Sequence, residues 1–282
     1  MLKFLKSFCL VGLLFLMCTQ AGGALVKEKT SRLGNSDKIW VTSFNDYKPF
    51  ASINQKQNGF DTIFSPLFET LEKQAHISAE YATQGTYKER LFQVVNGDID
   101  IVIGAYYDSD AYTGIDMIYP ALLTNPVTVV TMPYKTFNIK TRDDLQSLKG
   151  AIDSRELFSD HVSKQLEKLN LQKFDDSEKL YEQLFTGQID YILTSRYYGA
   201  LEQAKMGIRE MVSMSKHALW DMPMFIGVSA ITRKSEKIKK IIRKVLQAQQ
   251  NELKEQFQQR IIDEIRETDE ASQGVVPPSF VK

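Results

Sequence analysis

The chain has 282 residues, and its 35 Lys and Arg residues balance its 35 Asp and Glu residues. This balance argues against a nucleic-acid-binding protein, which typically has a strongly basic domain. The three histidines, His76, His161 and His217, are widely spaced, and no zinc-ligand spacing occurs. There is also no GxSxG motif and no phosphate-binding glycine loop. We therefore expect no metal, no cofactor and no catalytic residues.

The N-terminus has the three-part pattern of a secretory signal peptide. Lys3 and Lys6 precede an apolar run at 8–18, and small residues follow up to Ala24. The apolar run is shorter than the approximately 20 residues that span a bilayer. Residues 1–24 are therefore predicted to be a signal that is cleaved near Ala24, which places the mature chain in the periplasm. An uncleaved anchor and a lipid-modified Cys18 remain alternatives.

Strands and helices alternate in the first half of the chain. Apolar β-branched runs favour strands, and apolar residues at helical spacing favour helices. Asp61 is the expected N-cap of one helix, and Gly97 is the expected C-terminal cap of the next. The expected elements are a strand at 38–44, a loop with a small hairpin at 45–60, a helix at 61–74, a strand at 77–83, a helix at 87–97 and a strand at 99–105.

A second α/β series follows. The expected elements are a strand at 125–132, helices at 166–172 and 178–187, strands at 189–195 and 222–233, and a long helix from about 235 to 267. Alternating strands and helices predict an α/β fold with a parallel-type central sheet.

Two strands of this series end in similar loops. The strand at 99–105 follows an Asn-Gly pair and leads into Tyr106, Tyr107 and Asp108, and the strand at 189–195 follows a Thr-Gly pair and leads into Arg196, Tyr197 and Tyr198. Ligands of open parallel sheets bind beyond the carboxyl ends of the strands. We therefore expect both strand ends to face one cleft. The alternative is that these side chains are solvated loop residues or packing tyrosines.

The order of these features resembles the type II periplasmic solute-binding proteins, in the amino-acid-binding branch (extracellular solute-binding protein family 3) of ABC importer subunits. The segments that carry the resemblance are "VTSFNDYKPFASINQKQNGFD", "YKERLFQVVNGDIDIVIGA", "MIYP", "LQSLKG", "GQIDYILTS" and "IGVSAITRKSEKIKKII". The resemblance implies two α/β lobes joined by two hinge crossovers, near 119–126 and 221–227. Lobe 1 would comprise residues 38–121 and 227–267, and lobe 2 would comprise residues 126–222.

The chain departs from this family where the amino-acid clamp is expected. Ala111 stands where family members carry an Arg for the α-carboxylate, and Ser195 stands where they carry an Asp for the α-ammonium. The resemblance therefore implies a small solute other than an ordinary α-amino acid. Tyrosines that stack on the ligand, acids that hold an amine, and an arginine for an anionic or carbonyl oxygen would form the site. The candidate ligand-binding residues are Asp46, Tyr47, Tyr106, Asp108, Ser195, Arg196 and Tyr197.

The resemblance implies a monomer that closes on its solute by hinge bending and delivers it to an inner-membrane ABC permease. A sensor partner that signals ligand occupancy to a membrane receptor is an alternative. A dehydratase acting on cyclic carboxylates is another, although no nucleophile and base can be placed from the sequence.

Overall fold

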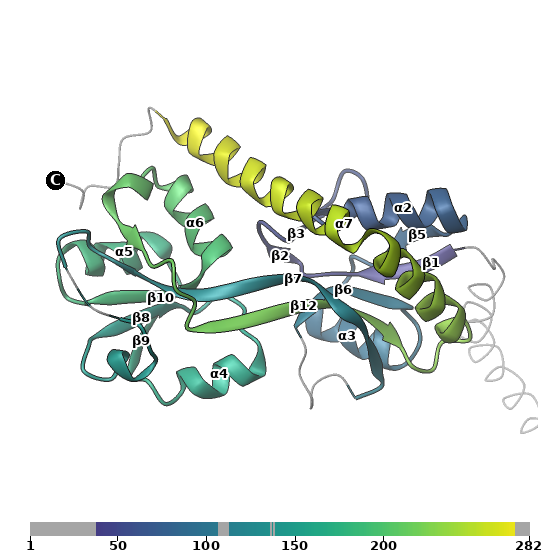
Figure 1. Cartoon of the computed structure of the whole chain (residues 1–282), viewed down its shortest axis with the longest axis horizontal. Helices are drawn as coiled ribbons and strands as arrows, with labels where there is room; N and C mark the ends of the chain where they lie inside the picture. The colour runs from purple at the N-terminus through teal and green to yellow at the C-terminus, as the bar shows by residue number, and fades with distance from the viewer. Residues whose placement is uncertain (1–37, 107–112, 136, 138, 274–282) are drawn as a thin grey trace, which may run out of the picture. The chain divides into compact units, whose positions relative to one another are not determined.

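A computed structural model describes residues 38–106, 113–135, 137 and 139–273 (Figure 1). The chain divides into two compact units, Met1–Lys38 and Ile39–Lys282. Apart from Lys38, every described residue belongs to the second unit, so the predicted signal peptide lies outside the described residues. No helix among the described residues is long and apolar enough to cross a membrane.

One mixed sheet runs through the second unit. Its strands are β1 (Lys38–Thr42), β5 (Ser78–Tyr81), β6 (Ile101–Tyr106), β7 (Ile115–Thr131), β8 (Gly150–Asp153), β9 (Leu171–Phe174), β10 (Tyr191–Ser195), β11 (Ser213–Met214) and β12 (Trp220–Ser229). Their order is β5-β1-β6-β12-β7-β10-β8-β9, and β11 also pairs with β7. Pairing is parallel between β1 and β6, β8 and β10, and β8 and β9. The predicted α/β fold with parallel-type sheets is confirmed.

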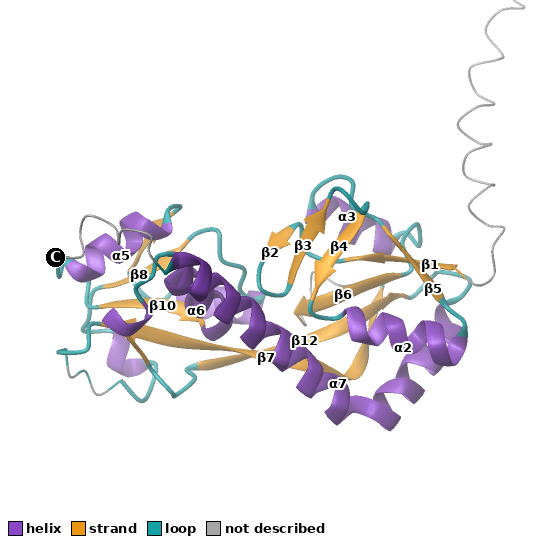
Figure 2. Ribbon diagram, turned by 90° about the horizontal axis from the view of Figure 1, so that it is seen from above, coloured by secondary structure: helices purple, strands orange, loops and turns teal. Residues whose placement is uncertain are grey.

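Two antiparallel strands join the parallel groups. Strand β12 pairs with both β6 and β7, and β7 pairs in turn with β10. We call the part built around β1, β5 and β6 lobe 1, the part built around β8, β9 and β10 lobe 2, and the β7–β12 pair the hinge strands (Figure 2). The residue limits given above for the lobes remain a prediction.

Helices cover the sheet in both lobes. They are α2 (Ser65–Ala75), α3 (Tyr87–Val95), α4 (Asp160–Leu166), α5 (Ser177–Phe185), α6 (Arg196–Lys205) and α7 (Ser235–Ser272), with 3₁₀ turns η1 (Asp143–Leu145) and η2 (Arg209–Met211). A separate small sheet in lobe 1 contains β2 (Asp46–Tyr47), β3 (Ala51–Asn54) and β4 (Gly59–Thr62).

Local sequence signals explain how α3 leads into β6. Thr86 and Glu89 form a reciprocal capping box at the start of α3. After the helix, Gly97 adopts a φ of +74°, a left-handed conformation that glycine reaches without steric cost. The chain then enters β6, which is buried along its whole length.

Three sequence predictions are wrong in detail. Residues 196–198, expected in a loop after β10, form the first turn of α6. Asp61 lies in β4 and does not cap α2, which begins after Phe64. The predicted helix at 166–172 is instead the end of α4 followed by β9. Leu169 and Leu171 alternate with polar residues, and such a short apolar run does not distinguish a strand from a helix.

Helix α7 contacts α2 in lobe 1 and α6 in lobe 2. The ring of Phe257 packs edge-on against Phe64 at the start of α2, with 5.2 Å between centroids. The next residue, Gln258, lies beside the Tyr197 side chain of α6. Neighbouring residues of one helical turn therefore contact both lobes.

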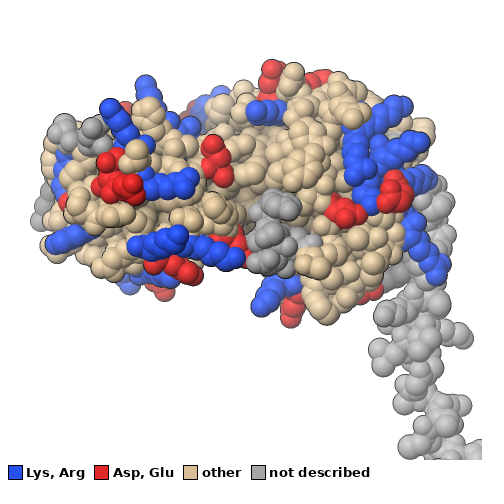
Figure 3. All heavy atoms as spheres, turned by 60° about the horizontal axis from the view of Figure 1, so that its bottom comes forward, with Lys and Arg blue, Asp and Glu red and all other residues tan. Residues whose placement is uncertain are grey.

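Charged side chains of both signs are spread over the surface in Figure 3. This distribution agrees with the balanced composition of the chain.

Candidate functional site

The carboxyl ends of β6 and β10 point toward each other across the hinge strands. Tyr106, the last residue of β6, pairs with Met224 of β12, and Ser195, the last residue of β10, pairs with Val127 of β7. Val127 in turn pairs with Trp220 of β12. Met224 and Trp220 are four positions apart, so the two strand ends are separated by about 13 Å along β12.

A chain of hydrogen bonds links the two lobes at this point. Asn125 of β7 donates through Nδ2 to the Tyr106 hydroxyl at 2.9 Å. The Tyr106 hydroxyl donates to the Tyr47 hydroxyl at 3.3 Å, and Tyr47 donates to the carbonyl oxygen of Leu157 at 3.0 Å. Tyr47 belongs to lobe 1 and Leu157 to lobe 2, so a single buried tyrosine connects them. Burial is the main reason that the pKa of Tyr47 lies well above its ordinary value, and the proximity of Tyr106 and then of Glu156 raises it further.

Aromatic rings fill the space around this hydrogen-bond chain. Tyr47 stacks on Tyr198 of α6, with 5.9 Å between centroids and 26° between ring planes. Phe50 packs edge-on against Tyr197 at 6.0 Å, and it also contacts Tyr47 at 5.3 Å. We call Tyr47, Phe50, Tyr197 and Tyr198 the interlobe aromatic cluster.

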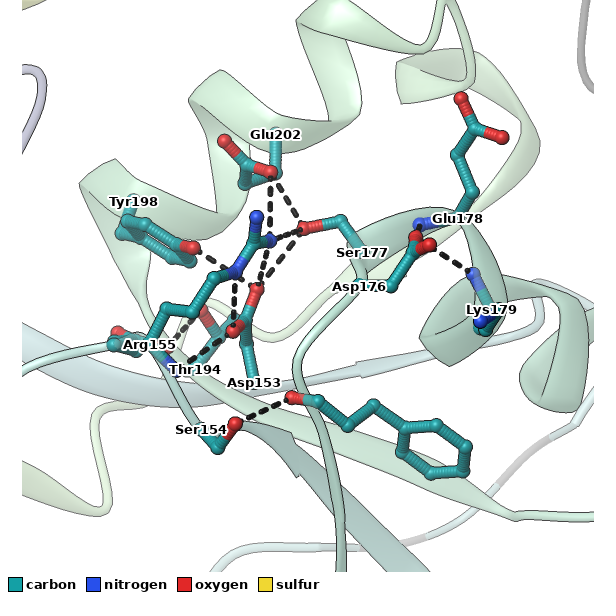
Figure 4. Close-up of polar contacts among 12 residues, drawn as sticks. Asp153, Ser154, Arg155, Asp176, Ser177, Glu178, Lys179, Thr194, Tyr198 and Glu202 are labelled. Atoms are coloured by element: carbon teal, nitrogen blue, oxygen red, sulfur yellow. Dashed lines mark hydrogen bonds and ion pairs between the residues drawn. The ribbon is translucent and has the colours of Figure 1, made fainter.

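Tyr198 contacts a polar network in lobe 2 that is largely buried except for Arg155 (Figure 4). Arg155 donates through Nε and Nη2 to the two carboxylate oxygens of Asp153 at 3.0 and 2.6 Å. Nη2 of Arg155 also donates to Ser177 at 2.7 Å and lies 3.7 Å from the Glu202 carboxylate. Tyr198 donates its hydroxyl to Asp153 at 2.9 Å. This network anchors Tyr198 where it stacks on Tyr47.

Hydrogen bonds within this network keep Asp153 and Arg155 in their charged forms. Burial alone would raise the pKa of Asp153, but hydrogen bonds from Arg155, Tyr198 and Ser177 outweigh it and hold that pKa below its ordinary value. The bond to Asp153 likewise raises the pKa of Arg155. Both side chains are therefore charged at neutral pH and compensate each other.

Glu156 behaves differently, although it directly follows Arg155. Its Oε2 accepts from the Thr194 hydroxyl at 2.8 Å, and its Oε1 accepts from the Ser195 backbone N–H at 2.5 Å. Burial raises its pKa to about 8 despite these hydrogen bonds. Glu156 is therefore mostly neutral at pH 7, and it lies within reach of the side chains of Ser195 and Tyr47.

Lobe 1 contains a buried arginine that donates hydrogen bonds to neutral groups. Arg90 is fully buried and donates to Thr42 Oγ1, to the carbonyls of Gly85 and Ser43, and to Asn45 Oδ1 at 2.5–2.7 Å. Burial lowers its pKa. These hydrogen bonds tie the loop after β1 to the turn before α3, which fixes the loop that carries Tyr47.

The structure brings together some of the predicted site residues. Tyr47, Tyr106 and Ser195 meet at the hinge strands, and Tyr197 joins through its contact with Phe50. Asp46 is exposed on β2. Arg196 donates to the carbonyl of Lys216 in its own lobe at 2.8 Å. Asp108 and Ala111 lie outside the described residues.

The sequence prediction did not include several residues that lie at this site. Asn125, Trp220 and Glu156 come from the hinge strands and from the loop after β8, and no strand-end motif marks them. A buried polar group needs a partner, but the sequence does not distinguish Asn125 from the other polar residues of β7, such as Thr124 and Thr128.

Among the described residues, no group of His, Cys, Asp or Glu could hold a metal ion. The hollow beside Asp153, Ser177 and Tyr198 has a volume of about 10 Å³, which is room for about one water molecule. Its lining residues all belong to lobe 2, so this hollow is separate from the contact between the lobes.

No family model and no curated protein matches this chain. Solved structures do match it. Holo ArgBP from T. maritima is 16% identical with a TM-score of 0.53, and the match covers 79% of this chain and 92% of that one. The L-arginine-bound amino acid ABC transporter substrate-binding protein AbpA from Streptococcus pneumoniae is 13% identical with a TM-score of 0.56, covering 86% and 98%.

This chain has the two-lobed type II periplasmic binding protein fold. A histidine kinase sensor domain with similarity to periplasmic binding proteins also shares it, at 15% identity and a TM-score of 0.55, covering 86% of this chain and 98% of that domain. The same periplasmic-binding fold thus occurs in free binding proteins and in a receptor domain. At these identities the likeness establishes the fold, and the ligand must be argued from the site.

Proposed function

We propose that this chain captures a small solute between its two lobes by hinge closure. The observation that carries the proposal is the position of Tyr47, which reaches from lobe 1 to the Leu157 carbonyl and to the ring of Tyr198 in lobe 2. These contacts lie where the carboxyl ends of β6 and β10 face each other, which is where open α/β sheets bind ligands. A solute that replaces them would hold the lobes together.

The proposed ligand-binding residues are those predicted from the sequence: Asp46, Tyr47, Tyr106, Asp108, Ser195, Arg196 and Tyr197. Ordinary α-amino acids are not expected to bind with sub-micromolar affinity, because Ala111 and Ser195 replace the charged groups expected to hold a zwitterion. Calorimetry with the twenty standard amino acids checks this expectation. A tight complex with one of them would contradict it.

We further propose that the chain is exported to the periplasm and acts as a monomer, delivering its solute to an inner-membrane ABC permease without bond chemistry. The fold shared with AbpA, an ABC transporter substrate-binding protein, supports delivery to a permease. The alternative is that the closed form signals to a membrane receptor, and the fold shared with a histidine kinase sensor domain favours that candidate. Co-purification with a permease or with a receptor kinase would separate the two.

Hinge closure is testable by spin labelling, because a chain that begins at Leu25 contains no cysteine. Lys56 in the β3–β4 turn and Lys179 on α5 are exposed and lie in different lobes. Double electron–electron resonance on a Lys56→Cys/Lys179→Cys chain measures the distance between the lobes, and Lys56→Cys/Lys88→Cys is the control within lobe 1.

A thermal-shift screen first selects solutes, because a ligand that binds only the folded state raises its melting temperature. Its members are amino acids, putrescine, benzoate, dipeptides, sugars and amides. A stabilising solute should shorten or narrow the distance distribution between the lobes and leave the control distribution unchanged. Identical interlobe distributions with and without such a solute would contradict hinge capture.

A further inference from the structure

One face of the hinge strands carries polar side chains between the two strand ends. Antiparallel partners share a face of a sheet, and so do residues two positions apart on one strand. The pairs Tyr106–Met224, Met224–Leu123, Met222–Asn125, Trp220–Val127 and Ser195–Val127 therefore place their side chains on a single face. We call this the hinge face, and its polar members are Tyr106, Asn125, Ser195 and Trp220.

Three atoms of the hinge face lack a hydrogen-bond partner among the described residues, and one of them is Ser195 Oγ, whose residue is fully buried. Asn125 Oδ1 and Trp220 Nε1 meet no partner within the described part of the chain, although their residues are only 0% and 4% exposed. Buried polar atoms in folded proteins are nearly always paired, and leaving one unpaired is destabilising. Asn125 Oδ1 is an acceptor, Trp220 Nε1 is a donor and the Ser195 hydroxyl can be either, so a molecule that pairs them must present a donor and an acceptor.

The Tyr47 hydroxyl shows how a polar group fits beside this face. The Tyr47 hydroxyl accepts a hydrogen bond from the Tyr106 hydroxyl, which in turn accepts one from Asn125. It also lies close to the Ser195 side chain. The loop before α4 covers the face from lobe 2, where the Ser159 backbone N–H contacts Met222 Sδ at 3.4 Å. A solute hydroxyl or amide could take the place of the Tyr47 hydroxyl once the lobes separate.

The charges around the hinge face are neutralised or solvated. Asp153 and Arg155 pair with each other, and Glu156 is mostly neutral at pH 7. Arg142 stacks on the Trp220 ring at 4.8 Å, but its side chain is exposed to solvent. A charged solute group buried at this face would therefore lose its hydration without gaining an opposite charge from the described residues, which is strongly unfavourable.

We propose that the hinge face binds an uncharged polar part of the solute, such as vicinal hydroxyls or a carboxamide, which donates to Asn125 Oδ1 and accepts from Trp220 N–H. This inference rests on the proposed solute capture and names the class of solute. It assigns Asn125 and Trp220 as specificity-determining residues.

The test compares two groups of solutes on the full exported chain. The uncharged group is D-ribose, D-glucose, myo-inositol, nicotinamide and propionamide, and the charged group is L-arginine, L-glutamate, putrescine and benzoate. Thermal shift identifies binders, and calorimetry gives their Kd. At least one uncharged member should give a saturable shift.

Substitutions on the hinge face then locate the binding. Asn125→Leu keeps the approximate shape and removes both amide atoms, and Trp220→Phe removes the indole N–H. Each should raise the Kd of the uncharged binder about tenfold or more, because the solute group would be left unpaired in a dry site. Asn170→Leu replaces an exposed asparagine of lobe 2 and is the matched control, with an unchanged Kd.

The ligand-free protein gives a second readout. Asn125→Leu removes a buried unpaired acceptor but also the Nδ2 hydrogen bond to Tyr106, so the two effects oppose each other and its melting temperature without solute should stay close to that of the wild type. A purely structural asparagine would instead make the variant less stable.

Each result decides the proposal. Binding only by charged members, or an unchanged Kd in both hinge-face variants, would overturn the uncharged-solute inference. A loss of melting temperature in ligand-free Asn125→Leu with no change in Kd would assign Asn125 a structural role. Charged binders that still close the lobes would leave the solute-capture function standing, whereas no binder of either group would remove both.

Discussion

Glu156→Gln offers a test of the electrostatics at the interlobe contact. The Glu156 pKa rises from its ordinary value of 4.5 to about 8 on burial. The folded chain therefore keeps a proton that the unfolded chain releases above about pH 4.5. Unfolding free energy must then fall as pH rises from 4.5 to 8, because the folded state binds more protons in that window.

The magnitude follows from that interval. Each pH unit corresponds to about 1.4 kcal/mol, so this group should remove about 4 kcal/mol of stability between pH 5 and pH 8. The glutamine of Glu156→Gln is neutral at every pH and lacks this loss. Its amide nitrogen cannot accept a hydrogen bond, however, so one of the bonds from Thr194 and Ser195 is lost, at a cost of about 1 kcal/mol.

Urea unfolding at pH 5, 6, 7 and 8 is the assay. Glu156→Gln should be slightly less stable than the wild type at pH 5 and more stable at pH 8, so the two stability curves should cross. Glu255→Gln changes an exposed glutamate of α7 and is the control, whose curve should follow the wild type. Parallel curves for the wild type and Glu156→Gln across this range would refute a buried, protonated Glu156.

Three further predictions concern the network, the site and export. Asp153→Asn should lower the unfolding free energy measured in urea by roughly 2 kcal/mol, because it removes the nearer of the two carboxylates beside the half-exposed Arg155. No loss would mean that the pair contributes nothing net. Arg196→Ala and Asp108→Ala should each weaken binding of the solute found by screening while the ligand-free melting temperature stays the same; unaltered Kd values in both would remove these residues from the site. Mass spectrometry of the periplasmic fraction should find a chain that begins near Leu25, whereas an intact N-terminus on membranes would contradict cleavage.

Long or strongly patterned segments were predictable from the sequence. The apolar runs of β6 and β10 and the helical periodicity of α7 each predicted an element that the structure contains. The segment at 166–172 was misread, because Leu166, Leu169 and Leu171 fit a helix as well as the start of a strand.

The site itself was less accessible from the sequence. Tyr106 and Ser195 could be placed together because parallel strand ends are functional positions. The pairing of Met222 with Asn125 and of Trp220 with Val127 depends on the register of two strands that are about 100 residues apart. No local pattern encodes that register, so the polar hinge face could not be foreseen.

The C-terminal helix α7 contacts both lobes and can therefore report lobe movement. Phe257 packs against Phe64 of lobe 1, while the adjacent Gln258 lies beside Tyr197 of lobe 2. When the lobes separate, one of these two attachments must break or the helix must slide. Amide hydrogen exchange in this single turn should therefore speed up in the open form and slow down in the closed form. Hydrogen exchange in this turn would then report lobe separation without a label in either lobe.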